Sequence, residues 1–416
     1  MNPDQALVSL GRHIVHLVDG WPAWVPFVVG LLLSVVPLVV VFPGIFALTT
    51  WLERKGLARL QGRIGPNRAG PLGLLQPMAD GIKMLLKEVI WPRAADPFLL
   101  SIAPVLVLVP AMVVLALIPF GRNMTAAPVD TAVILFFAIG GLGTLGVFLA
   151  GWSSRNKYAL LGGMRALSQM VSYELPLVLA AVPAVMMAGS LATTRIVESQ
   201  QITDWVHGPA SPVWQQALGG VLGWNIWTPW GLCGFFILFV ASLAECNRAP
   251  FDLPEADSEL VAGHLTEYSG FKYALFFMAE YINAFALSGL AITLYLGGWN
   301  GPNIRPPWIA ADAPGATEAL LIPGFVWFFL KLFAMIALMI WIRGSTPRLR
   351  SDQLMAFCWK FLLPLALCNI LVTGFYRFVP WYVGWPVSLL VLGLAFEGLG
   401  RFVSPAKMDA REYRYA

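Results

Sequence analysis

The sequence predicts an all-α polytopic membrane protein with about nine transmembrane helices and additional amphipathic surface helices. Its 416 residues are 58% hydrophobic and only 12% charged, and the mean hydropathy is +0.71. Charged residues make up about twice that share in ordinary globular proteins. Several apolar runs also approach the roughly 20 residues that a helix needs to cross the hydrocarbon core. No soluble domain of useful size remains, so residues 1–416 are expected to form a single integral membrane domain.

The predicted spans follow one another with few long polar connections. In chain order they cover about 24–50, 98–119, 131–151, 167–189, 229–244, 272–297, 322–342, 355–374 and 380–400. A preceding segment, 5–18, is mildly amphipathic and could lie in the membrane interface. Because it lacks a basic start, a cleavable signal peptide is not expected.

The distribution of Lys and Arg predicts the orientation in the membrane. Most of these residues fall in one alternating set of connections, whereas the other set holds only Arg12, Arg122, Arg195, Arg305 and Arg377. The N-terminus is therefore expected outside and the C-terminus inside. Three long connections, 51–97, 152–166 and 244–271, are then cytoplasmic and form a docking face.

The sequence contains no motif for a redox cofactor, a metal or a nucleotide. Cys233, Cys246, Cys358 and Cys368 form no C-x-x-C pair, and scattered thiols in helices are a better expectation than two disulfides. No glycine-rich phosphate-binding pattern occurs. The net charge of +4 reflects basic residues beside the spans and does not indicate nucleic-acid binding.

The first cytoplasmic connection combines bases with acids. Residues 51–68 read WLERKGLARLQGRIGPNR, and the following 72–91 segment is an amphipathic pattern that places Asp80, Lys83 and Lys87 on one polar face. Such a helix should lie on the membrane. The bases alone suit an anchor for anionic lipid. The accompanying acids favour a polar floor under a cavity, with Glu53, Arg54, Asp80 and Lys83 pointing inward.

The second connection leads into a span that carries polar residues. Arg165, Ser168, Gln169 and Ser172 form a stripe, and Glu174, nine residues after Arg165, lies about 180° away on an ideal helix. A carboxylate this far into an apolar segment is costly, so it indicates function. The alternative is an interfacial side chain that reaches water.

The third connection gathers an unusual number of carboxylates. Residues 244–267 contain one base, Arg248, and six acids, which are Glu245, Asp252, Glu255, Asp257, Glu259 and Glu267. Asp252-Leu-Pro-Glu255 resembles a helix N-terminus, but capping needs only one or two acids. Glu280 follows within a span. We therefore expect Glu174, Glu245, Glu255, Glu267 and Glu280 to form a chain of titratable groups suited to proton movement, whereas the isolated Lys331 and Glu397 rank lower.

Three long motifs resemble the NuoH family of membrane subunits in respiratory complex I, the proton-pumping NADH–quinone oxidoreductase. They lie in about 50–97, 151–177 and 243–282 and include GWSSRNKYALLGGMRALSQMVSYELPL and AECNRAPFDLPEADSEL. Asp257 departs from the Glu common in relatives. The resemblance implies a membrane subunit with no redox cofactor of its own, and the chain length and outer loops favour the bacterial inner membrane over the mitochondrial one. It also implies quinone as substrate, with FMN and iron–sulfur clusters in peripheral-arm partners and small membrane-arm subunits beside it.

The same resemblance implies roles for individual residues. A quinone chamber would be lined or supported by Glu53, Arg54, Asp80, Lys83, Arg165, Arg248, Phe251 and Asp252. Proton coupling would fall to Glu174, Glu245, Glu255, Glu267 and Glu280, and no residue of this chain would make or break bonds.

Three other interpretations remain open at the level of sequence. One is the homologous membrane subunit of an ion-translocating hydrogenase or formate hydrogenlyase. Another is a free-standing secondary transporter, although we find no internal repeat of the kind that such folds use. The third is a passive anchor for peripheral subunits, in which Glu174 and Glu280 would be dispensable.

Overall fold

The computed structural model describes residues 24–122, 124–201, 219–254, 261–302 and 323–403. Within these ranges the chain is helical and contains no strand. The expected interfacial helix 5–18 lies outside them. The first half comprises α2 (Trp24–Leu60), η1 (Pro71–Gly73), α3 (Gln76–Leu86), α4 (Pro97–Leu115), α5 (Ala132–Gly140), α6 (Leu142–Ser153), α7 (Lys157–Ala188) and α8 (Thr193–Ser199).

The second half of the chain continues the bundle. It comprises η2 (Asn225–Trp227), α10 (Pro229–Glu245), η3 (Gly263–Leu265), α12 (Gly270–Tyr295), α13 (Gly324–Ser345), α14 (Ser351–Phe357), η4 (Cys358–Leu362), α15 (Leu363–Phe378) and α16 (Trp381–Val403). Eight helical segments in the described ranges are long and apolar enough to cross a membrane, and α10 is a shorter apolar helix. Each of the predicted spans therefore has a helical counterpart, which confirms the fold class.

Helix boundaries differ from the expected ones where glycine governs the backbone. Helix α2 continues to Leu60 and ends just before Gly62, which has a φ of 67°. Beyond it, Leu72 and Gly73 also have positive φ, so the amphipathic helix α3 begins only at Gln76. It ends at Leu86, well before the expected end at 91. Glu53 and Arg54 thus lie on the last turns of α2, not in a loop.

Two further spans are built differently from their sequence pattern. The 131–151 run forms α5 and α6, which meet at Gly141. Helix α7 begins at Lys157, where the side chain of Asn156 accepts a hydrogen bond from the Tyr158 amide. Helical structure therefore covers most of the 152–166 connection and carries Arg165 directly above the apolar part of the same helix.

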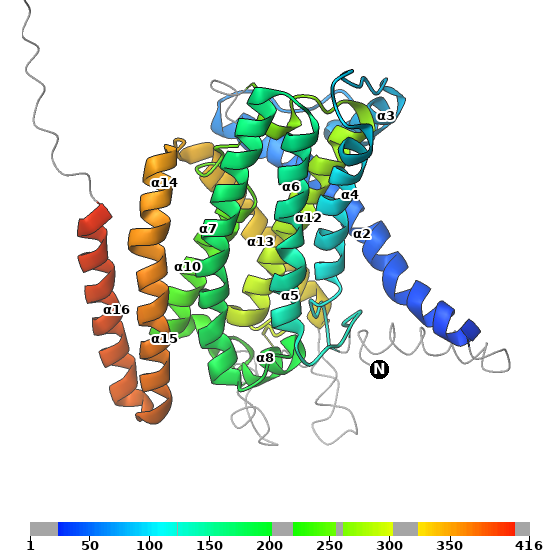
Figure 1. The fold of residues 1–416 in the computed structure, drawn as a ribbon. Coiled ribbons are helices and arrows are strands. Elements are labelled where there is room, and N and C mark those ends of the chain that lie inside the picture. The colour runs from blue at the N-terminus through cyan, green and yellow to red at the C-terminus, as the bar shows by residue number, and fades with distance from the viewer. Residues whose placement is uncertain (1–23, 123, 202–218, 255–260, 303–322, 404–416) are drawn as a thin grey trace, which may run out of the picture.

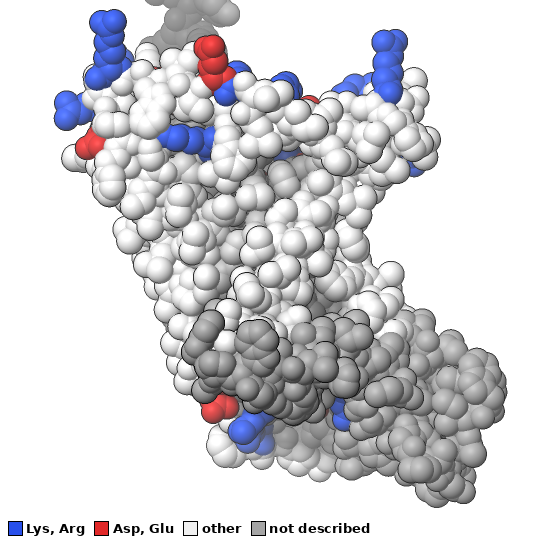
Figure 2. Space-filling view, turned by 90° about the vertical axis from the view of Figure 1, so that its right-hand side faces the viewer, with Lys and Arg blue, Asp and Glu red and all other residues white. Residues whose placement is uncertain are grey.

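Helices α7, α10 and α12 lie at the centre of the bundle, between α16 on one side and α2 on the other (Figure 1). The central α12 has the largest buried share of the spanning helices, whereas α2 and α16 are mostly exposed. On the face seen in Figure 2, charged side chains gather at the two ends and leave an uncharged belt between them. That distribution fits a helix bundle surrounded by lipid.

Candidate functional site

A buried arginine, Arg248, forms the centre of the candidate site. It follows α10 directly, and only 4% of its surface is exposed. Its Nη1 donates to the carboxylate of Glu53 on α2 at 3.3 Å, and its Nε lies 3.2 Å from the carboxylate of Glu280 on α12. Two acids from helices far apart in sequence therefore share one guanidinium.

Other polar side chains complete this buried network. Arg343, from the end of α13, pairs with Glu53, and the hydroxyl of Tyr281 donates to the same carboxylate. The Arg248 guanidinium also lies 4.1 Å from the centroid of the Tyr281 ring. The network thus contains two carboxylates and two guanidinium groups, a balance that reduces the cost of burying each charge.

The charges around Arg248 also act on its own ionisation. Burial alone would lower the pKa of Arg248, but the negative charges of Glu53 and Glu280 outweigh that effect and raise the pKa above its usual value. Arg248 is therefore a permanent positive charge between two carboxylates.

The connection after Arg248 is held against α7 and the end of α13. Gln169 donates its side-chain amide to the carbonyls of Ala244 and Phe251, at 2.8 and 2.7 Å. The Phe251 ring packs 5.6 Å from that of Tyr173. Asp252 pairs with Arg348 at 3.1 Å. The expected capping role of Asp252 involves residues 255–260, which lie outside the described residues.

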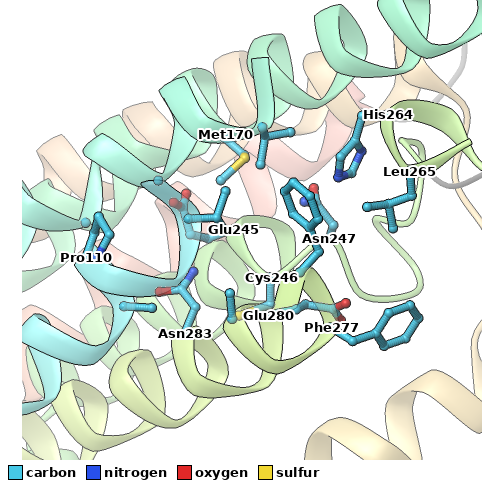
Figure 3. Close-up of a pocket in the computed structure, with 17 residues that line it drawn as sticks. Pro110, Met170, Glu245, Cys246, Asn247, His264, Leu265, Phe277, Glu280 and Asn283 are labelled. Atoms are coloured by element: carbon cyan, nitrogen blue, oxygen red, sulfur yellow. The ribbon is translucent and has the colours of Figure 1, made fainter. Parts of the chain in front are cut away.

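A small cavity of about 60 Å³ continues from this network into the bundle (Figure 3). Its polar lining comes from α10, η3 and α12, and its apolar lining comes largely from α4 and α5–α7. The polar and titratable lining residues are Glu245, Cys246, Asn247, His264, Glu280 and Asn283. Glu280 thus belongs both to the Arg248 network and to the cavity that Glu245 also lines.

The remaining predicted coupling residues do not line the cavity among the described residues. Glu174, half-buried on α7, occupies space left by Gly141, whose Cβ would lie 3.0 Å from Glu174 Oε1. Its charge acts on Glu245. Glu267 accepts a hydrogen bond from Asn156 at 2.7 Å. Glu255 lies outside the described residues.

Among the predicted residues of the first connection, Arg54, Asp80 and Lys83 form a group apart from the Arg248 network. Asp80 on α3 pairs with Arg54 at 2.5 Å and with Lys83 at 3.4 Å. Burial raises the pKa of Asp80, but the hydrogen bond and charge of Arg54 outweigh it and hold the pKa below 3.8. The Arg54 and Lys83 side chains are mostly exposed, so Glu53 is the buried member of this set. Arg165 lies partly exposed on α7.

Several site residues were missed because they stand in ordinary sequence contexts. Tyr281 follows Glu280 directly, and Arg343 and Arg348 look like bases that flank a span. His264 lies beside the acidic motif, but a single histidine forms no sequence motif from which a role could be predicted. Proximity to Glu280 was no signal for Tyr281, because its hydroxyl donates to Glu53 on a distant helix.

Lys331, which ranked low, is buried at the other end of the bundle. Its ammonium donates to the carbonyls of Leu296, Gly298 and Asn300, at distances of 2.5 to 2.9 Å. These carbonyls lie just beyond the end of α12, where helix acceptors lack intrahelical donors. Lys331 therefore stabilises the end of α12, whereas Glu397 forms an exposed pair with Arg401.

Comparison with known proteins gives consistent results. A family model described as NADH dehydrogenase matches residues 33–374. A protein of Koribacter versatilis, named as an H-type subunit of NADH-quinone oxidoreductase, is 42% identical over 371 residues, covering 84% of this chain and 97% of the relative. A protein of Dehalococcoides mccartyi with the same type of name is 43% identical over 325 residues, covering 78% and 80% respectively.

Proposed function

Because this chain belongs to the NADH dehydrogenase family of membrane subunits in NADH–quinone oxidoreductase, we propose that it forms the quinone-access chamber of that enzyme. We further propose that it forms the acidic path that couples quinone reduction to proton translocation. The chamber is lined or supported by Glu53, Arg54, Asp80, Lys83, Arg165, Arg248, Phe251 and Asp252. The coupling residues are Glu174, Glu245, Glu255, Glu267 and Glu280.

The position of Glu280 supports this proposal more than any other observation. Its carboxylate contacts Arg248, which also holds Glu53, and it lines the cavity that contains Glu245. A change in charge at the Glu53 end therefore alters how strongly Arg248 attracts Glu280. Since an opposite charge a few ångströms away favours the ionised carboxylate, this change shifts the proton affinity of Glu280 and then of its neighbours in the cavity.

This mechanism assigns this chain an electrostatic role without bond-making chemistry. Electron transfer to the quinone belongs to FMN and iron–sulfur clusters in partner subunits. Peripheral-arm subunits dock on the end of the bundle that carries 51–97, 152–166 and 244–271, and small membrane-arm subunits pack against its sides. The apolar helices and the bacterial relatives support a place in the bacterial inner membrane.

The proposal is tested by Glu245→Gln in the complete enzyme in native membranes. This change keeps the size of the side chain and removes its ability to ionise, so we expect NADH:quinone turnover and proton uptake to fall together. Assembly is measured in the same preparation. Glu397→Gln, on the exposed pair of α16, is the matched control and should behave like the wild type.

The opposite result would remove the coupling role. If Glu245→Gln retains wild-type turnover and pumping in an assembled complex, the acidic motif is a docking surface and the path proposed here does not exist.

A further inference from the structure

His264 is a buried titratable residue to which the proposed path assigns no role. It lies on η3, between α10 and α12, and only 5% of its surface is exposed. Its side chain borders the same cavity as Glu245 and Glu280 (Figure 3). Glu245, Cys246 and Glu280 are the titratable groups among the described residues that share this cavity.

The packing around His264 fixes its position. A Cβ on Gly162 of α7 would lie 2.5 Å from the Cα of Gly263, so the absence of this atom allows η3 to contact α7 closely. On the other side, the imidazole packs edge-to-face against Phe276 of α12, with ring centroids 5.8 Å apart. The ring is therefore held at the cavity wall by two helices.

The imidazole nevertheless has an unsatisfied polar atom. Nδ1 of His264 is buried and has no hydrogen-bond partner among the described residues. Leaving such an atom unpaired is costly, and an apolar side chain would fill the space without this cost. The adjoining cavity of about 60 Å³ is large enough to admit a water molecule.

The segment that carries His264 reaches the surface on both sides of it in sequence. Three residues before it, Val261 is 62% exposed, and three residues after it, Glu267 is only half-buried. Burial lowers the pKa of His264 to about 4, so the ring is neutral at physiological pH. A neutral imidazole has one nitrogen that accepts a proton and one that donates.

We propose that His264 is a proton-relay residue that passes protons between the exposed part of this connection and the carboxylates of Glu245 and Glu280. This inference rests on the proposed function. A proton bound from the surface side converts the ring briefly to imidazolium. The proton on Nδ1 then passes to cavity water, which in turn protonates a carboxylate. This leaves the ring neutral with its proton on Nε2, and a shift of that proton to Nδ1 resets the ring for the next transfer.

The test uses His264→Gln and His264→Phe in the complete enzyme in native membranes. The first variant keeps polar atoms, the second keeps a ring against Phe276, and neither side chain can carry a proton. We expect turnover coupled to proton uptake to fall about tenfold or more in each assembled variant, as the loss of a positioned acid–base group typically produces. The solvent deuterium isotope effect should rise, and the KM for quinone should stay unchanged.

A matched control distinguishes proton relay from packing. Tyr268 also packs on Phe276, with centroids 4.9 Å apart, and its buried hydroxyl does not border the cavity. Tyr268→Phe should therefore keep wild-type turnover. If either His264 variant keeps wild-type turnover, the inference is wrong. It is also wrong if turnover falls while the isotope effect stays unchanged and the KM for quinone rises, because His264 is then a packing residue.

Glu245→Gln, measured in parallel, separates this inference from the proposed function. Impaired coupling in Glu245→Gln together with normal coupling in both His264 variants refutes the role of His264 alone. Normal coupling in Glu245→Gln refutes the path itself, and the role of His264 with it.

Discussion

At the scale of single residues, Glu53 is a buried charge with three polar partners. Glu53 is 3% exposed, and its carboxylate pairs with Arg248 and Arg343 and accepts a hydrogen bond from Tyr281, from three different parts of the chain. Removing one partner from a buried ion pair leaves uncompensated charge and typically costs about 3–5 kcal/mol. Glu53 therefore contributes to stability as well as to the proposed chamber.

We predict that Glu53→Gln destabilises the assembled subunit by about 3–5 kcal/mol, because Arg248 and Arg343 lose their shared counter-charge. The measurement is the thermal unfolding midpoint of the purified complex. Glu53→Asp, which keeps the charge on a shorter side chain, should fall between Gln and the wild type. The exposed pair Glu397–Arg401 provides the control, since such pairs contribute little. Equal effects of Glu53→Gln and Glu397→Gln would contradict the assignment.

At the scale of secondary-structure elements, α3 depends on one polar attachment to α2. Its exposed side chains include Met78, Ile82 and Leu85, and the described contacts to α2 include the pair between Asp80 and Arg54. An amphipathic helix of 11 residues is marginal by itself in water. The pair therefore contributes to holding α3 beside α2, together with packing against α12.

The attachment of α3 should depend on pH in a defined direction. Because the pKa of Asp80 is held below 3.8, the stability from its pair with Arg54 is fully present above that value. It is lost as the pH falls through the lowered pKa. We predict faster amide hydrogen exchange in α3 of Asp80→Asn than in wild type at pH 7, and equal exchange well below pH 3.8. A difference that persists in strong acid would show that Asp80 acts through something other than its charge.

Helix α3 also shows the limit of sequence reasoning at this scale. The polar face of Asp80 and Lys83 follows from their spacing, and the structure confirms their contact. The start of the helix did not follow, because positive φ at Leu72 and Gly73 reflects how the backbone folds over its neighbours. Local pattern therefore predicted the helix type and missed its bounds.

At the scale of the whole molecule, the orientation in the membrane stays a prediction. The basic connections lie at one end of the bundle, and α4 separates Arg93 from Arg122. This helix has 19 residues, which corresponds to a length of about 28 Å. Both arginines are exposed. They are suitable positions for deciding which end faces the cytoplasm.

We predict that Arg93→Cys reacts with a membrane-impermeant maleimide only from the cytoplasmic side, and Arg122→Cys only from the outside. Intact cells and inverted vesicles give the two accessibilities. The unsubstituted chain, whose Cys246 and Cys358 are buried, measures the background. Reversed labelling of the two positions would show that the orientation predicted from the Lys and Arg distribution is wrong.

The sequence by itself determined the class of this protein and the chemistry of its charged motifs. Hydropathy and length predict membrane-spanning helices because both are local properties of a segment. The acids Glu53, Glu245 and Glu280 were identified because a carboxylate beside apolar runs requires an explanation. These inferences need only neighbouring residues, and the helical fold and the family comparison confirm the class.

Only the tertiary structure decided which of these groups meet. Glu53 pairs with Arg343 across 290 positions and with Arg248 across 195, and His264 reaches the cavity because Gly162 lets η3 approach α7. Such contacts depend on how α2, α10, α12 and α13 pack together. Packing brings together side chains from distant segments, so no local sequence spacing specifies these partners. Each buried charge nevertheless needs its partner, because an unpaired charge is costly in the interior.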